Sequence, residues 1–153
     1  MLFRSTATAI FVRGLMVTVD NIELLRNGNI EVIGRLVHAS NASLFCKVSS
    51  GEKTCNAIYK PIAGERPLWD FPDGNLASRE VATFLVSQAL GLDCVPPTIL
   101  RDGPFGQGSI QFWVDEVEEV GDRYLEQSDG LRKIAFLDAV VNNTDRKISH
   151  LLF

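Results

Sequence analysis

Hydrophobic and polar residues alternate with the two-residue period of β-strands along the first half of the chain. The pattern predicts strands over residues 30–37 (IEVIGRLV), 44–48 (LFCKV) and 54–60 (TCNAIYK). A polar link at 38–43 joins the first two strands as a hairpin, and turn-forming residues at 49–53 join the second to the third. We therefore expect the domain to open with an antiparallel meander.

The second half begins with a loop at 61–74, which carries three prolines and two glycines. Helical spacing then predicts a helix over 75–90, with Asp73 or Asn75 as its cap and Glu80 at the edge of its apolar stripe. Strands over 97–100 and 109–114 flank a turn at 102–106. A second helix, over 131–141, is apolar nearly all round, and we expect it to be buried. The fold class is therefore α+β. The apolar stripe of the first helix consists of Ala77, Val81, Phe84, Leu85 and Gln88.

Composition narrows the class of protein. The 153 residues are enough for one ordinary domain. Lys and Arg number 15 against 19 Asp and Glu, a net charge of −4, which disfavours a nucleic-acid partner because such binders carry a basic stripe. The three cysteines lack metal-ligand spacing and are expected to be reduced thiols in a cytoplasmic protein. We expect no transmembrane segment, because no apolar run is long enough to cross a bilayer.

Residues 1–19 form an extension or leader of uncertain status. They are apolar, carry Ser and Thr, and include Arg4 and Arg13 but no acidic residue. Two interpretations stay open: a mitochondrial-type presequence, or an extension upstream of a natural start at Met16. The domain proper is expected to cover residues 20–153.

The polar segment 142–150 (NNTDRKISH) combines an acid, a base and an imidazole. Asp145 is followed two residues later by Lys147 and five residues later by His150. In phosphotransferase catalytic loops, an Asp orients the attacking hydroxyl, a Lys offsets charge on the phosphoryl group, and the residue five after the Asp helps to hold Mg²⁺. The segment therefore predicts a catalytic loop.

Several motifs carry a resemblance to a known family. They are LLRNG at 24–28, GRLV at 34–37 with ASNA at 39–42, YKP at 59–61, GERPLWDFPDG at 64–74 and DAVVNN at 138–143. From about residue 20 to 152 the chain resembles the bacterial, mainly actinobacterial, phosphatidylinositol 3- and 4-kinase-like proteins. These are distantly similar to lipid kinases and toxin-type serine kinases.

The resemblance implies a protein-kinase-like small lobe over about 28–116 and the start of a helical large lobe over about 117–153. In that fold Lys60 contacts the phosphates of bound ATP and Glu80 is its ion-pair partner. The 38–43 link takes the place of the phosphate-binding loop, and Val114 lies on the strand that leads to the adenine-binding hinge. Each of these roles has a structural alternative. Lys60 would be an exposed lysine and Glu80 a solvated glutamate. The link would be an ordinary hairpin turn, and the strand with Val114 a plain core strand. The implied phosphate contacts in the link are Ser40, Asn41 and Ser43.

For the catalytic loop, the resemblance implies that Asp145 orients the substrate hydroxyl and Lys147 lies by the γ-phosphate. His150 stands where related kinases have Asn as a metal ligand. Imidazole is a softer ligand than Mg²⁺ prefers, so Mn²⁺ is an alternative cofactor. The expected partners are thus a nucleotide and a hydroxyl acceptor of unknown class.

The sequence ends soon after this loop, so the second metal-binding Asp of kinase-like folds has no counterpart here. From this we expect a C-terminally truncated kinase-like chain that binds ATP and transfers phosphate weakly or not at all. Two other hypotheses stay open. One is a non-catalytic, pseudokinase-like binding or scaffold module, and the other is a small α+β interaction domain with an incidental loop resemblance.

Overall fold

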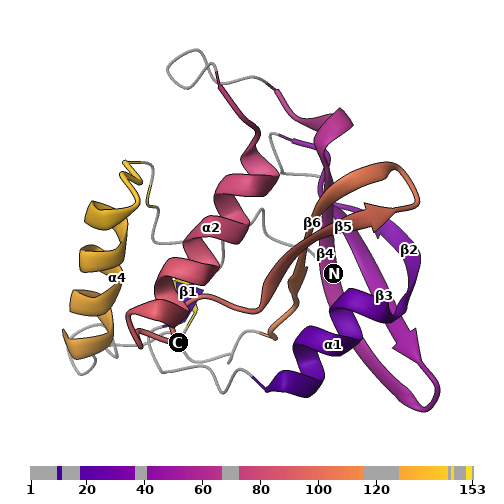
Figure 1. Ribbon diagram of the computed structural model, residues 1–153, viewed down its shortest axis with the longest axis horizontal. Helices are drawn as coiled ribbons and strands as arrows, with labels where there is room; N and C mark the ends of the chain where they lie inside the picture. The colour runs from indigo at the N-terminus through magenta and orange to yellow at the C-terminus, as the bar shows by residue number, and fades with distance from the viewer. Residues whose placement is uncertain are drawn as a thin grey trace.

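A five-stranded antiparallel sheet makes up one side of the structure, at the right in Figure 1. In this computed structural model the described residues are 10–11, 18–36, 41–66, 73–115, 128–144, 146 and 151–152. The sheet has the spatial order β2-β3-β4-β6-β5. Its strands are β2 (Asn29–Arg35), β3 (Leu44–Ser50), β4 (Lys53–Pro61), β5 (Thr98–Gly103) and β6 (Gly106–Phe112).

Three helices lie among the described residues, and their bounds are α1 (Val19–Asn27), α2 (Leu76–Ala89) and α4 (Ser128–Val140). A single 3₁₀ turn, η1 (Ile62–Gly64), follows β4 directly. A short parallel pair joins β1 (Ile10–Phe11) to β7 (Leu151–Leu152), so residues near the two ends of the sequence lie side by side. The predicted α+β class, the meander and the second hairpin are confirmed.

Helix α1 covers one face of the sheet and was not predicted from the sequence. Leu24 and Leu25 are buried against alternate residues of the central strands, among them Tyr59 and Ile110. Arg101 of β5 donates from Nη1 to the carbonyl oxygens of Leu25 and Gly28, at 2.7 and 2.9 Å. These contacts hold the C-terminal end of α1, where a cation is favoured by the helix dipole.

Helix α2 contacts the sheet from the other side. Lys60 neighbours Tyr59 on β4, and because successive side chains of a strand point to opposite faces, it lies on the face away from α1. Glu80 of α2 reaches that residue. Figure 1 shows α2 between the sheet and α4. One face of the sheet is therefore covered by apolar side chains of α1, and the other face presents polar groups to α2.

Helix α4 packs by one side only, so the prediction that it is buried all round was wrong. Ile134 and Leu137 enter a core cluster with Phe84 of α2. Phe136 and Val140, however, are 53% and 51% exposed. Leu85, which the sequence placed on the inner side of α2, is also exposed. An apolar residue type does not reveal which side of a helix meets its neighbour, since that depends on how the helices cross.

In the part of the chain that the structure describes, none of the helices has both the length and the apolar character needed to cross a membrane.

Candidate functional site

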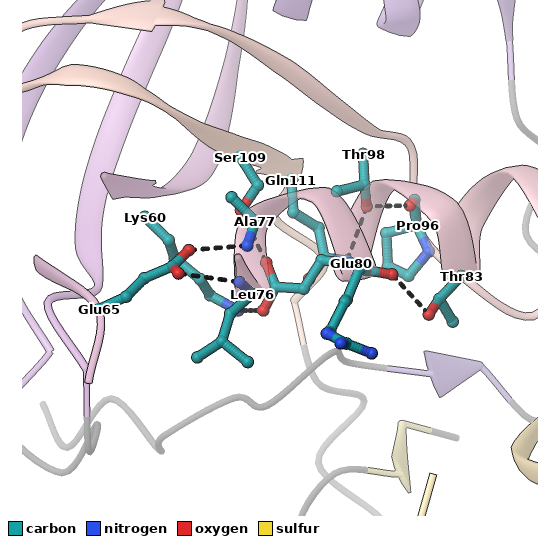
Figure 2. A network of polar contacts seen from close by, with 11 residues as sticks. Lys60, Glu65, Leu76, Ala77, Glu80, Thr83, Pro96, Thr98, Ser109 and Gln111 are labelled. Atoms are coloured by element: carbon teal, nitrogen blue, oxygen red, sulfur yellow. Dashed lines mark hydrogen bonds and ion pairs between the residues drawn. The ribbon is translucent and has the colours of Figure 1, made fainter. Parts of the chain in front are cut away.

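A buried ion pair between Lys60 and Glu80 is the most distinctive polar feature of the structure (Figure 2). Lys60 Nζ lies 2.6 Å from Glu80 Oε1, and the two side chains are only 11% and 16% exposed. Ser109 is 1% exposed, and its hydroxyl donates a hydrogen bond to Glu80 Oε2 at 2.7 Å. Both carboxylate oxygens are therefore bound, which offsets the cost of taking the charges out of water. The ion pair that the family resemblance implied is present.

Strand pairing explains why Ser109 belongs to this group. Lys60 and Ser109 are directly opposite each other in the antiparallel β4–β6 ladder. Partners in such a ladder point to the same face, so the ammonium group and the hydroxyl both project toward α2. Gly108, the neighbour of Ser109, allows this close approach, because a Cβ there would lie 2.3 Å from the carbonyl oxygen of Lys60. The sequence analysis missed Ser109, although its place opposite Lys60 follows once the register is known.

A second buried chain of hydrogen bonds lies on the same face of the sheet. Gln111 donates from Nε2 to Thr98 Oγ1 at 2.8 Å, and Thr98 donates to the carbonyl oxygen of Pro96 at 2.8 Å. Figure 2 places these residues beside Glu80. These two hydrogen bonds connect β6 to β5 and to the residues just before β5.

The segment before α2 supplies another feature that the sequence analysis missed. Glu65 accepts hydrogen bonds from the backbone N–H groups of Leu76 and Ala77, at 2.8 and 2.7 Å. Asn75, one of the two predicted caps, accepts from the N–H of Ser78 at 2.7 Å. Three N–H groups of the first turn, which have no partner inside the helix, are thus satisfied by side chains.

The predicted phosphate-contacting link is described only in part. Ser40 lies outside the described residues. Asn41 Oδ1 accepts from the N–H of Arg66 at 3.0 Å, so its side chain is turned toward the segment that contains Glu65. Ser43 is 4% exposed, which leaves its hydroxyl little access to a ligand in this conformation. The nucleotide-binding role of these residues stays a prediction.

Val114 lies beyond the end of β6, and not within a strand as the sequence suggested. The preceding residue, Trp113, donates its N–H to the carbonyl oxygen of Asn56 at 2.9 Å. Its ring also packs edge-on against Phe45, with centroids 5.3 Å apart. Val114 is thereby held next to β4, on a segment that leaves the sheet. The assignment of this segment as the lead into an adenine-binding hinge stays a prediction.

A second polar cluster anchors the start of the predicted catalytic loop. Arg146 donates from Nη2 and Nε to the two carboxylate oxygens of Asp138, at 2.6 and 2.9 Å. Asn143 Nδ2 also donates to Asp138 Oδ1 at 2.8 Å, and Asn142 has φ of 55°, a left-handed conformation common just past a helix end. Asn142 and Asn143 therefore lie at the C-terminal end of α4, and Asn143 is tied back to that helix through Asp138. Asp145, Lys147 and His150 themselves lie outside the described residues.

The three cysteines lie in buried or partly buried surroundings. Burial raises the pKa of the Cys46 thiol to about 11, and it also raises the pKa values of Cys55 and Cys94. A hydrogen bond from Ser87 opposes part of this effect at Cys94. All three are free thiols, as expected, and their raised pKa values disfavour a nucleophilic role. Within the described ranges, no group of three or more potential metal ligands lies together.

The chain is similar to a longer mycobacterial protein. It is 37% identical to Protein Rv2133c of Mycobacterium tuberculosis over 178 aligned residues, which cover 91% of this chain and 64% of that protein. The chain therefore spans 64% of the relative's length, and the relative's name states no activity. No family model matches the chain, and no solved structure matches it. The kinase-like fold and function that the sequence resemblance implies therefore remain predictions.

Proposed function

We propose that this chain binds ATP at the Lys60–Glu80 pair and is the nucleotide-binding part of a kinase-like phosphotransferase with a hydroxyl acceptor. The observation that carries the proposal is the 2.6 Å ion pair between the third strand of the sheet and the helix that follows it. Protein kinases use a lysine on the third strand and a glutamate on the next helix in this way, with the lysine oriented toward the phosphates. A kinase-like small lobe is therefore our interpretation of the α+β fold.

The energetics of the pair support a functional interpretation. Burying two charges is costly, and apolar residues in their place are often as stable or more stable. A lysine that served stability alone would gain more from lying at the surface. Glu80 is also held by Ser109, so the carboxylate is fixed before any ligand arrives. This arrangement keeps an ammonium group in a defined position on the sheet face opposite α1, as binding of a phosphate group requires.

The second part of the proposal concerns the loop after α4. When bound, ATP with Mg²⁺ or Mn²⁺ would supply the phosphoryl group, and we assign the orienting of the acceptor hydroxyl to Asp145 and charge compensation to Lys147. His150 is our candidate metal ligand. The bidentate contact of Arg146 with Asp138 supports this assignment, because it ties the residue next to Asp145 to the end of α4. A loop held in this way loses less entropy when it orients a substrate.

Nucleotide binding can be tested by thermal shift with ATP and either Mg²⁺ or Mn²⁺. ATP at ten times its Kd stabilises a protein by about 1.4 kcal/mol, which corresponds to roughly 3–6 °C for a domain of this size. We expect Lys60→Met to abolish the shift. The matched control is Lys47→Met, which removes an exposed positive charge from the neighbouring strand β3 and should keep the shift.

The outcomes separate the hypotheses. No shift with wild-type protein at millimolar ATP would overturn the proposal. A shift that Lys60→Met abolishes supports it, and phosphotransfer that Asp145→Asn abolishes would extend it to catalysis. ATP binding without any transfer by the longer relative would favour a pseudokinase-like module instead.

A further inference from the structure

The position of Glu65 suggests more than an ordinary helix cap. Its carboxylate binds the first two N–H groups of α2 from a segment eleven residues earlier, at the end of η1. A local capping residue would come from the helix itself or from the residue just before it, a place that Asn75 already fills. The Glu65 contact is therefore a tertiary clamp between two separate segments.

The clamp acts on the turn of α2 that determines where Glu80 lies. Glu80 follows Leu76 by four residues and Ala77 by three, so it is on the same side of the helix as both residues that Glu65 holds. Figure 2 shows the Glu65 carboxylate and the Lys60–Glu80 pair next to the same first turn. A shift of this turn would move the carboxylate of Glu80 relative to Nζ of Lys60.

The other side of the clamp reaches the link between β2 and β3. The N–H of Ala42 donates to the carbonyl oxygen of Gly64 at 3.3 Å, and the N–H of Arg66 donates to Asn41 Oδ1 at 3.0 Å. A Cβ on Gly64 would lie only 2.4 Å from the Cβ of Ala42, so the two segments are in close contact. Both residues that flank Glu65 in sequence are thus bound to the link that we assign to phosphate binding.

We propose that Glu65 is a positioning residue that couples the 41–42 link to α2 and thereby holds Glu80 in its ion pair with Lys60. The effect on nucleotide affinity rests on the proposed function, whereas the effect on the ion pair does not. Glu65 touches neither the reacting groups nor Lys60 in the described contacts, so it acts through the helix. Loss of its carboxylate should free the first turn of α2 and make the ammonium group of Lys60 more accessible.

The test measures acylation of Lys60 by acetic anhydride, followed by peptide mass spectrometry, with the exposed Lys47 as internal reference. We expect Glu65→Ala to raise the relative labelling of Lys60 about fivefold, the change in population that fits a cap of ordinary strength. The matched control is Thr18→Ala, which removes the side-chain cap of α1. It costs similar stability at a helix on the opposite face of the sheet from Lys60, and it should leave the labelling unchanged. Glu65→Gln keeps the side-chain length and one acceptor oxygen, so it should fold even if the alanine variant does not, with a smaller increase.

A second readout is the Kd of ATP with Mg²⁺ or Mn²⁺, which should rise in the Glu65 variants and not in Thr18→Ala. Unchanged labelling in both Glu65 variants would overturn the proposal, and so would an equal increase in Thr18→Ala, because that would indicate general loosening. Raised labelling in a protein that binds no ATP would refute the proposed function and still support the positioning role. Raised labelling together with a weaker ATP complex would support both.

Discussion

The Lys60–Glu80 pair allows a double-mutant cycle whose size can be worked out from the structure. At 2.6 Å and an effective dielectric constant of 20, the Coulomb attraction is about 6 kcal/mol. The cost of removing both charges from water offsets most of this gain. A single substitution should lower the free energy of unfolding by more than the net contribution of the pair, because it leaves one largely buried charge without its partner.

We expect Lys60→Met and Glu80→Gln each to lower the free energy of unfolding by about 3 kcal/mol, at the lower end of the range for buried pairs because both side chains keep some exposure. The double variant should lose about 4 kcal/mol and not the sum, which gives a coupling energy of about 2 kcal/mol. Urea unfolding followed by tryptophan fluorescence would measure these values, provided that the m-value stays constant.

The chain offers an exposed ion pair as control. Lys53 Nζ lies 3.1 Å from Asp20 Oδ2, but these side chains are 64% and 74% exposed. The cycle of Lys53→Met and Asp20→Asn should give a coupling energy below about 0.5 kcal/mol. If the Lys60–Glu80 cycle were equally small, the claim that the buried pair is strongly coupled would be refuted.

Two further predictions follow from other parts of the structure. Arg146→Lys should lower the free energy of unfolding by about 1–2 kcal/mol and speed amide exchange at Asn143, because an ammonium group cannot reproduce the two-point contact with Asp138; unchanged exchange would argue against an anchored loop. For Cys46, burial raises the folded-state pKa to about 11 from 9.0, so the protonated thiol's contribution to stability is present below pH 9 and is lost as the pH rises toward 11. The free energy of unfolding, measured with urea across this pH range, should therefore fall less steeply with pH in Cys46→Ala than in the wild type. Identical slopes of this free energy against pH would contradict the assigned burial effect.

Much of the fold could be predicted because its signals are local. The alternation in 44–48 and 54–60 and the turn residues between them specify the β3–β4 hairpin, since side-chain direction and turn geometry depend on neighbouring residues. Helix α2 has a cap at Asn75 and apolar residues at helical spacing. Lys60 and Glu80 could be paired only through the family resemblance, because they are twenty residues apart in the sequence.

Helix α1 illustrates a signal that was present and overlooked. Thr18 accepts from the N–H of Asn21 as its cap, Asp20 lies in the first turn, and Gly28 follows the end. These are ordinary helix boundary signals. Nine residues, however, are too few for a stable isolated helix, so α1 depends on its packing and on Arg101, more than seventy residues later in the chain.

The sequence by itself thus determined the three-strand meander, the second hairpin and the position of helix α2. Only the tertiary structure decided that Ser109 supports Glu80, that Glu65 clamps α2, and that Arg146 ties the loop to Asp138. The physical reason is the distance along the sequence over which each interaction acts. Periodicity and capping act between residues a few positions apart, whereas a buried charge is satisfied by whichever group the packed fold brings within hydrogen-bond distance.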